Sequence, residues 1–186
     1  MWKMRTLLLT VVFFFAASCA STTMESTWKD TSSPAAALTK LAVICLARNE
    51  GMRRMAEDEV VRQIGTGRVQ QSYRALENID LRDRAAVKAS LMQQGFDGVL
   101  VMRLAGVTHE VTAVPTSTFD AYYGWAAYQP VVDTVVRVTS NLYSLPMNRL
   151  VWAGTSKTFD PGSAQQVVDD VSRAVGKELK KDRLVI

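Results

Sequence analysis

The chain contains few of the residues that most often carry out catalysis or bind metals. Its 186 residues include a single histidine, His109, and two cysteines, Cys19 and Cys45. A Ser-His-Asp triad needs a serine on a strained turn beside the histidine, and the sequence has no G-x-S-x-G motif. A metal site built from histidine, cysteine and carboxylates also lacks ligands. We therefore expect a protein that is not an enzyme, with no catalytic residue, metal or cofactor, and we interpret His109 as a half-exposed strand residue.

A phosphate-binding loop is also missing. Residues 65–67 read Gly-Thr-Gly, but neither a third glycine nor a Gly-Lys-Ser/Thr sequence follows, so we interpret them as the end of a helix. The adjacent carboxylates Glu57, Asp58 and Glu59 have no nucleophile or metal ligand beside them in sequence. We interpret these three as a solvated helix face rather than a catalytic pair.

The net charge is too small to indicate a nucleic-acid partner. The whole chain carries 22 basic and 18 acidic residues, a formal charge of +4. Removal of residues 1–18 takes away Lys3 and Arg5, which leaves 20 basic against 18 acidic residues and a net charge of +2. A nucleic-acid-binding domain is expected to show a concentrated basic footprint, so we expect no nucleic-acid partner.

The N-terminal apolar run is too short to cross a membrane. Residues 7–17 form an apolar run of eleven residues behind the basic pair Lys3 and Arg5. A bilayer-spanning helix needs about 20 apolar residues, whereas an export signal needs a shorter run and a site with small side chains. The sequence therefore predicts a signal peptide over residues 1–18.

The processing site contains a cysteine. Ala16-Ala17-Ser18-Cys19 resembles the lipobox of bacterial lipoproteins, with Ala16 where leucine is usual. The resemblance implies that Cys19 becomes the mature N-terminus and carries lipid, which anchors the protein to a membrane. Ala20 stands where an aspartate would favour inner-membrane retention in enterobacteria, so by that analogy we expect the periplasmic face of the outer membrane. The alternative is cleavage elsewhere, with Cys19 an ordinary thiol.

The predicted mature chain has two parts. Residues 19–40 combine the lipidated cysteine with a Ser/Thr-rich segment that we interpret as a flexible tether. Residues 41–186 then form one periplasmic α/β domain, a usual size for a single core. Cys45 lies in the apolar run at residues 41–47, and we expect it to be a buried free thiol rather than a disulfide partner.

Hydrophobic periodicity indicates a mixed α/β sandwich. The predicted order is β-α-β-α-β-β-β-α, with parallel early strands and an antiparallel later hairpin. Strands are predicted at residues 41–47, 69–76, 98–114, 132–142 and 149–159. Helices are predicted at residues 49–64 and 80–94 and after Ser163, which forms a capping box with Gln166. Asp97 is expected to organise the turn before the third strand.

This order resembles a broad group of bacterial envelope lipoproteins. The residues that carry the likeness are the apolar start at 41–46, the Gly-Phe-Asp-Gly-Val-Leu-Val at 95–101, and the Leu-Val-Trp-Ala-Gly at 150–154. In element order, residues 41–179 are similar to uncharacterised envelope lipoproteins and to the α/β domain of the curli-secretion lipoprotein, the penicillin-binding-protein activator lipoprotein and the N-terminal domain of the Tol–Pal beta-propeller protein. The curli protein's long hairpin insertions are not expected in a chain of this length.

Aromatic residues are concentrated in one segment. Residues 115–130 are predicted to be irregular, and they include five aromatics within ten positions: Phe119, Tyr122, Tyr123, Trp125 and Tyr128. Tyrosine and tryptophan are enriched at binding hot spots and membrane interfaces. Two interpretations stay open, a loop that folds back to bury its rings over the sheet edge and an exposed loop that docks a partner.

We therefore expect a non-enzymatic, lipid-anchored protein that binds an envelope protein or a peptidoglycan-associated partner. Self-association into a homo-oligomer is a further candidate. The alternative is a periplasmic domain that binds a small ligand or nucleotide at the carboxyl ends of the parallel strands, with Arg48, Asn49 and Arg103 lining the site.

Overall fold

The computed structural model describes residues 22–32, 38–65 and 67–185. Its elements in chain order are β1 (Thr22–Lys29), β2 (Leu41–Leu46), α1 (Glu50–Ile64), β3 (Val69–Gln71), α2 (Ser72–Ala75), α3 (Arg84–Gln93), β4 (Gly98–Pro115), α4 (Thr118–Tyr123), β5 (Tyr128–Ser144), β6 (Arg149–Phe159) and α5 (Ala164–Lys181). They form one α/β domain, which confirms the predicted fold class.

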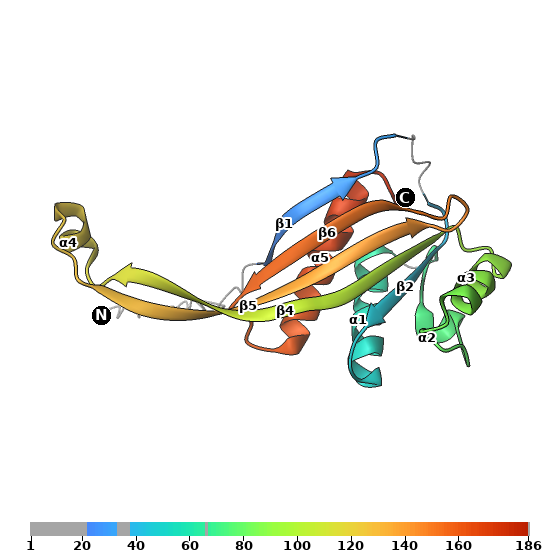
Figure 1. Ribbon diagram of the computed structural model, residues 1–186, viewed down its shortest axis with the longest axis horizontal. Coiled ribbons are helices and arrows are strands. Elements are labelled where there is room, and N and C mark those ends of the chain that lie inside the picture. Colours follow the sequence, from blue (N-terminus) through green and yellow to red (C-terminus); the bar gives the residue numbers. More distant parts are fainter. Residues whose placement is uncertain (1–21, 33–37, 66, 186) are drawn as a thin grey trace, which may run out of the picture.

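The strands form one mixed sheet in the order β1-β6-β5-β4-β2-β3 (Figure 1). β2 pairs in parallel with both β3 and β4, and β4, β5, β6 and β1 pair antiparallel in succession. The parallel part arises because helices connect its strands, whereas the short turn between β5 and β6 requires antiparallel neighbours. The predicted parallel early strands and antiparallel later hairpin are confirmed.

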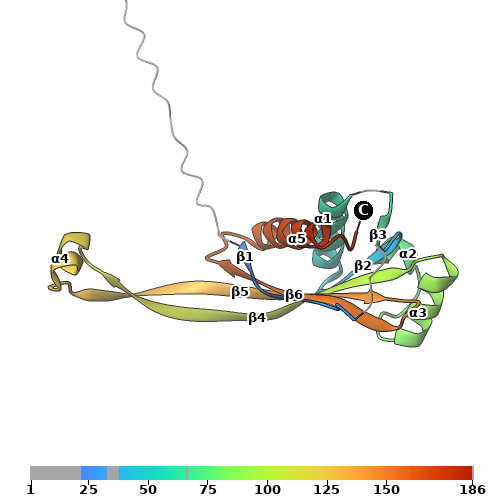
Figure 2. The same cartoon turned by 90° about the horizontal axis from the view of Figure 1, so that it is seen from above.

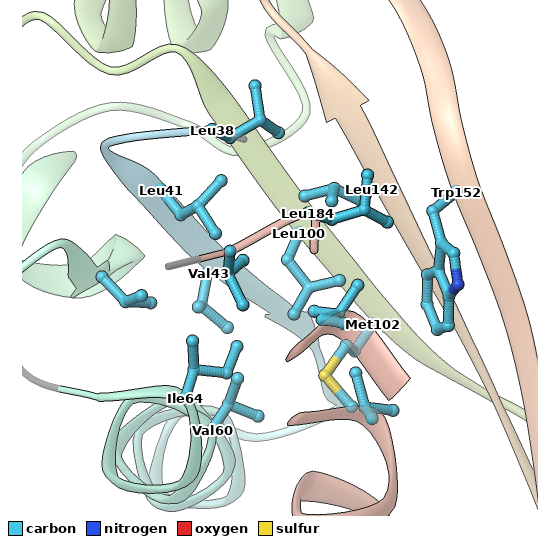
Figure 3. Packing of buried hydrophobic residues seen from close by; sticks show 14 of the residues in the cluster. Leu38, Leu41, Val43, Val60, Ile64, Leu100, Met102, Leu142, Trp152 and Leu184 are labelled. Carbon is cyan, nitrogen blue, oxygen red and sulfur yellow. The ribbon is translucent and has the colours of Figure 1, made fainter. Parts of the chain in front are cut away.

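Helices cover the sheet on both faces. Figure 2 shows α1 and α5 side by side on one face and α3 on the other. The larger core lies under α1 and α5, where Leu100, Leu142 and Trp152 pack with Val60 of α1 (Figure 3). Val175 of α5 belongs to the same core. A smaller core under α2 and α3 is built around Leu91 and Phe96. A sheet buried on both faces near β2 explains the continuous apolar run of that strand.

Side-chain caps begin the longer helices. Asn49 Oδ1 accepts the Met52 N–H at 2.7 Å, and Ser163 Oγ accepts the Gln166 N–H at 3.1 Å. The Gln166 side chain accepts the N–H of Gly162, one residue before the position expected for a capping box. α3 begins later than predicted, because Asp83 rather than Asp80 supplies its cap.

Four local predictions need correction. Thr22–Lys29, expected within a flexible tether, forms the edge strand β1, whose Met24 packs against the core. The predicted strand at 69–76 stops at Gln71, where α2 begins. The irregular segment at 115–130 contains α4 and the start of β5. β4 and β5 also form a long hairpin, which was not expected in a chain of this length, and it extends far beyond the rest of the sheet (Figure 1).

Asp97 organises the turn before β4, as predicted. Its carboxylate accepts the backbone N–H groups of Thr39 and Lys40 and the hydroxyl of Thr39, at 2.7–2.9 Å. These bonds connect the start of β4 to the segment that enters β2. Cys45 is buried and free, also as predicted, and burial raises the pKa of its thiol.

Candidate functional site

The outer part of the β4–β5 hairpin is a two-stranded ribbon. β2 pairs with β4 only as far as Arg103, and β6 pairs with β5 only from Val135 onward. Beyond these points, residues 109–115 and 128–134 pair with each other alone within the described part of the chain, and residues 104–108 pair with residues 135–138, which also pair with β6. We call these residues, with the connecting segment 116–127, the hairpin arm. An isolated two-stranded ribbon is only marginally stable in water, and its free edges offer backbone hydrogen bonds to a partner.

The two faces of the hairpin arm differ in chemistry. Directly paired residues share a face, so Val107 lies with Val136, Val111 with Val132 and Pro115 with Tyr128. This apolar face continues the side of the sheet that α1 and α5 cover, but neither of these two helices extends over it (Figure 2). Its large side chains are exposed: Leu104, Val107, Val111, Tyr128 and Val132.

The other face of the arm is polar at its base. Arg137 donates to Glu110 at 2.9 Å and to Glu25 of β1 at 3.2 Å, and Lys157 of β6 donates to the second oxygen of Glu110 at 3.0 Å. Hydrogen bonds from Arg137 and Lys157 lower the pKa of the Glu110 carboxyl. These contacts connect the base of the arm to two neighbouring strands and fix which face is polar.

A short helix ends the arm. The Ser117 side chain caps α4 by accepting the Asp120 N–H, and Gly124 ends the helix in the left-handed conformation with φ 78°. Thr116 closes the base of the loop, because its N–H and hydroxyl both donate to the Ala127 carbonyl, at 2.9 and 3.0 Å. The aromatic segment is therefore a defined turn, not an unstructured loop.

The aromatic rings of this turn contact one another rather than the domain. The Tyr123 ring lies 4.8 Å from Phe119, 5.2 Å from Tyr122 and 5.7 Å from Trp125, between ring centroids. Tyr122 is 85% exposed and Trp125 76% exposed, and Phe119, Tyr123 and Tyr128 are also exposed. The interpretation in which these rings fold back over the sheet edge is wrong. We call these five residues the aromatic tip.

The other predicted site residues are not brought together. Asn49 caps α1, Arg48 is exposed, and Arg103 lies on the opposite face of the domain from α1, beside α3. His109 is exposed on the arm, and its Nδ1 lies 3.5 Å from the Thr134 hydroxyl. Cys19 lies outside the described residues, so its lipidation stays a prediction.

Glu57 was misassigned by sequence reasoning. Its side chain is fully buried, and its carboxylate accepts the Cys45 N–H at 3.0 Å, the Ser72 hydroxyl at 2.6 Å and the Tyr73 N–H at 3.3 Å. Glu59 is also buried, beside Arg62 and Gln63. The expected solvated face is therefore wrong for both residues. A helical plot of α1 could have given the signal, because Glu57 lies on the same face as Val60 and Val61, one turn away, and Ile64, two turns away.

The described residues contain neither a metal-binding cluster nor a membrane-spanning helix. No group of three or more histidine, cysteine or carboxylate side chains is arranged to hold a metal ion in the described residues. None of the helices in these residues is long and apolar enough to cross a membrane.

Comparisons with known proteins give distant structural likenesses. No protein-family model matches the chain, and no curated protein sequence matches it. The PelC dodecamer structure from Paraburkholderia phytofirmans is 16% identical, over 84% of this chain and 96% of that one, with a TM-score of 0.48. The lipoprotein GNA1162 of Neisseria meningitidis is 12% identical, over 77% of this chain and 99% of that one, with a TM-score of 0.41. A minor lipoprotein of Acinetobacter baumannii is 12% identical, over 79% of this chain and 96% of that one, with a TM-score of 0.29.

The chain is thus distantly similar in structure to PelC and to bacterial lipoproteins. At these scores, function has to be argued from the residues of the chain itself. The finer resemblance to the curli-secretion, penicillin-binding-protein-activator and Tol–Pal proteins stays a prediction.

Proposed function

We propose that this chain is a non-enzymatic lipoprotein, anchored through Cys19 at the periplasmic face of the outer membrane, that docks an envelope partner through its aromatic tip. The observation that carries the proposal is the exposure of five aromatic side chains at the end of the hairpin arm. Large exposed apolar patches on soluble domains are commonly interaction sites, and these rings contribute nothing to either core.

The chemistry of the tip suits a protein partner. Tyrosine and tryptophan offer large apolar areas with a polar end, and they lose little conformational entropy on binding. α4 and the Thr116–Ala127 closure hold the rings in place before a partner arrives, which lowers the cost of ordering them. The apolar face and free edges of the hairpin arm extend the same surface toward the domain. A second copy of this chain is one candidate for the partner.

The aromatic tip can be tested by a triple variant. Replacing Phe119, Tyr123 and Trp125 by alanine should reduce partner capture at least about 100-fold, because each hot-spot aromatic contributes about 2 kcal/mol or more. The melting temperature should change by no more than a few degrees, since these side chains are exposed. Capture is measured in living cells with a photo-crosslinking residue at Tyr122, followed by mass spectrometry.

The control for this experiment is Trp28→Ala, which removes a half-exposed aromatic from β1 and should leave capture unchanged. Crosslinks of the chain to itself would identify self-association through the arm. If Tyr122 yields no product, or if the triple variant unfolds, docking through the tip is wrong.

Lipid attachment has its own test. Cys19→Ser removes the thiol that accepts the diacylglycerol group, so labelling with radioactive palmitate should fall to background. The variant should stay unprocessed or leave the membrane fraction. Cys45→Ser, the matched control, should keep its label, because Cys45 is buried in the domain. Retained labelling in Cys19→Ser would place the attachment elsewhere.

A further inference from the structure

A groove lies beside α3. This helix is on the face of the sheet opposite α1 and α5 (Figure 2). Its volume is about 720 Å³, within the range of about 300–1,000 Å³ typical of small-molecule sites. Apolar side chains form most of its surface: Ile44, Leu46, Val101 and Tyr143 on the strands, and Val87 and Leu91 on α3. Leu46 is a large exposed apolar residue at its margin.

The charged residues lining this groove are all basic. They are Arg84, Lys88, Arg103 and Arg149, and no aspartate or glutamate lines the groove. Arg149 forms an ion pair with Asp30 at 3.0 Å. Lys88 donates to the Asn148 side chain at 2.8 Å and Arg103 to the Thr139 hydroxyl at 3.3 Å, both neutral acceptors. Among the described residues, Arg84, Lys88 and Arg103 have no carboxylate partner.

The shape of the groove favours an extended chain over a helix. The bond between Lys88 and Asn148 connects α3 to the β5–β6 turn beside the groove. The strand residues form the floor of the groove, which runs along β4 from Val99, next to this turn, to Arg103. These four residue steps span about 13 Å at the rise per residue of a strand. A floor of this length would contact only about two turns of a bound helix, whereas an extended acyl chain can lie along all of it.

We propose that this groove binds a long-chain carboxylate, with the acyl chain on the apolar floor and the carboxylate paired with Arg103 at the far end of the floor from the β5–β6 turn. Apolar burial supplies most of the affinity, Arg103 pairs with the negative head group, and Lys88 adds to the positive charge of the groove. This site is separate from the aromatic tip and does not depend on the docking function proposed above.

Photolabelling of the full-length protein in dodecyl maltoside micelles tests the proposal. The probe is palmitate that carries a diazirine on its chain, and labelled positions are mapped by peptide mass spectrometry. Label should appear on peptides that contain Leu46, Val101 or Tyr143, and unlabelled palmitate should compete while hexadecanol should not. Lys88→Gln combined with Arg103→Gln should reduce this labelling at least about tenfold.

The matched control is Arg173→Gln with Lys177→Gln, which removes two exposed cations from α5 on the other face and should not change labelling. Unchanged labelling in the groove double variant, or equal competition by hexadecanol, would overturn the proposal. The proposal would also be overturned if palmitate labelled no groove peptide and an acidic amphipathic peptide protected the groove instead.

Discussion

Replacing Trp152 by alanine should lower the free energy of unfolding by about 3–5 kcal/mol, a large part of the 5–15 kcal/mol typical of a domain. Trp152 lies on β6 with its side chain fully buried between the sheet and α5 (Figure 3). Its Nε1 donates to the Asp182 carboxylate at 3.1 Å, just beyond the end of α5. The variant therefore loses apolar contact and also leaves a cavity that the surrounding strands cannot fill.

Gly154 shows how closely the sheet packs around this ring. A Cβ added there would lie 2.5 Å from the Trp152 ring and 2.6 Å from the Met24 methyl group. Urea unfolding, followed by circular dichroism, measures the effect, and Trp28→Ala is the control. Trp28 is 50% exposed, so its replacement should change the unfolding free energy by no more than about 0.5 kcal/mol. Equal effects of the two variants would contradict the placement of Trp152 in the core.

Local patterns were sufficient for most of the fold. The apolar run at 41–46, the helix-capping residues Asn49 and Ser163, and the apolar stripe of α5 each act within a few residues, so the sequence alone predicts them. The parallel arrangement of β3, β2 and β4 follows from the helices that connect these strands. The aromatic tip was also visible as a concentration of rings, although its exposure was not.

Features that depend on distant partners could not be predicted. β1 is rich in threonine and serine, and it becomes a strand because β6, more than 120 residues away, supplies its hydrogen bonds. The length of the hairpin arm follows from cross-strand pairs such as Val111 with Val132, which a short window does not detect. The groove beside α3 gathers residues from five elements and two connecting segments, and the sequence gives no sign of their proximity.

Glu57 is the clearest case of a residue whose role depends on tertiary contacts. β3 pairs with β2 only as far as Val43, so the Cys45 N–H has no strand partner on that side. Glu57 Oε1 accepts this N–H and the Ser72 hydroxyl, and Oε2 accepts the Tyr73 N–H. One carboxylate on α1 thus replaces missing sheet hydrogen bonds and also fixes the start of α2.

Replacing Glu57 by alanine should lower the free energy of unfolding by about 3–5 kcal/mol. Three donors would lose their acceptor, and each buried unsatisfied donor costs about 1–3 kcal/mol. The control is Asp58→Ala, since Asp58 is the exposed neighbour that accepts from Gln71 and Tyr73 at the surface. Its replacement should cost less than about 1 kcal/mol. Similar losses in the two variants would contradict the structural role of Glu57.

The pH dependence of Glu57→Gln gives a second, independent measurement. Burial raises the pKa of Glu57 in the folded protein, against partial opposition from hydrogen bonds donated by Ser72, Cys45 and Tyr73 and from the charge of Arg53. The folded state then binds this proton more tightly than the unfolded state, where the pKa is about 4.3. The stability of the parent protein relative to Glu57→Gln should therefore be greatest below pH 4. It should fall as the pH rises through the raised pKa, because ionisation in the folded state then carries the cost of burying the charge. Urea unfolding of both proteins from pH 4 to pH 8 measures this difference in unfolding free energy. If the advantage of the parent protein grew with pH, the ionised carboxylate and not the acid would be the favoured buried form.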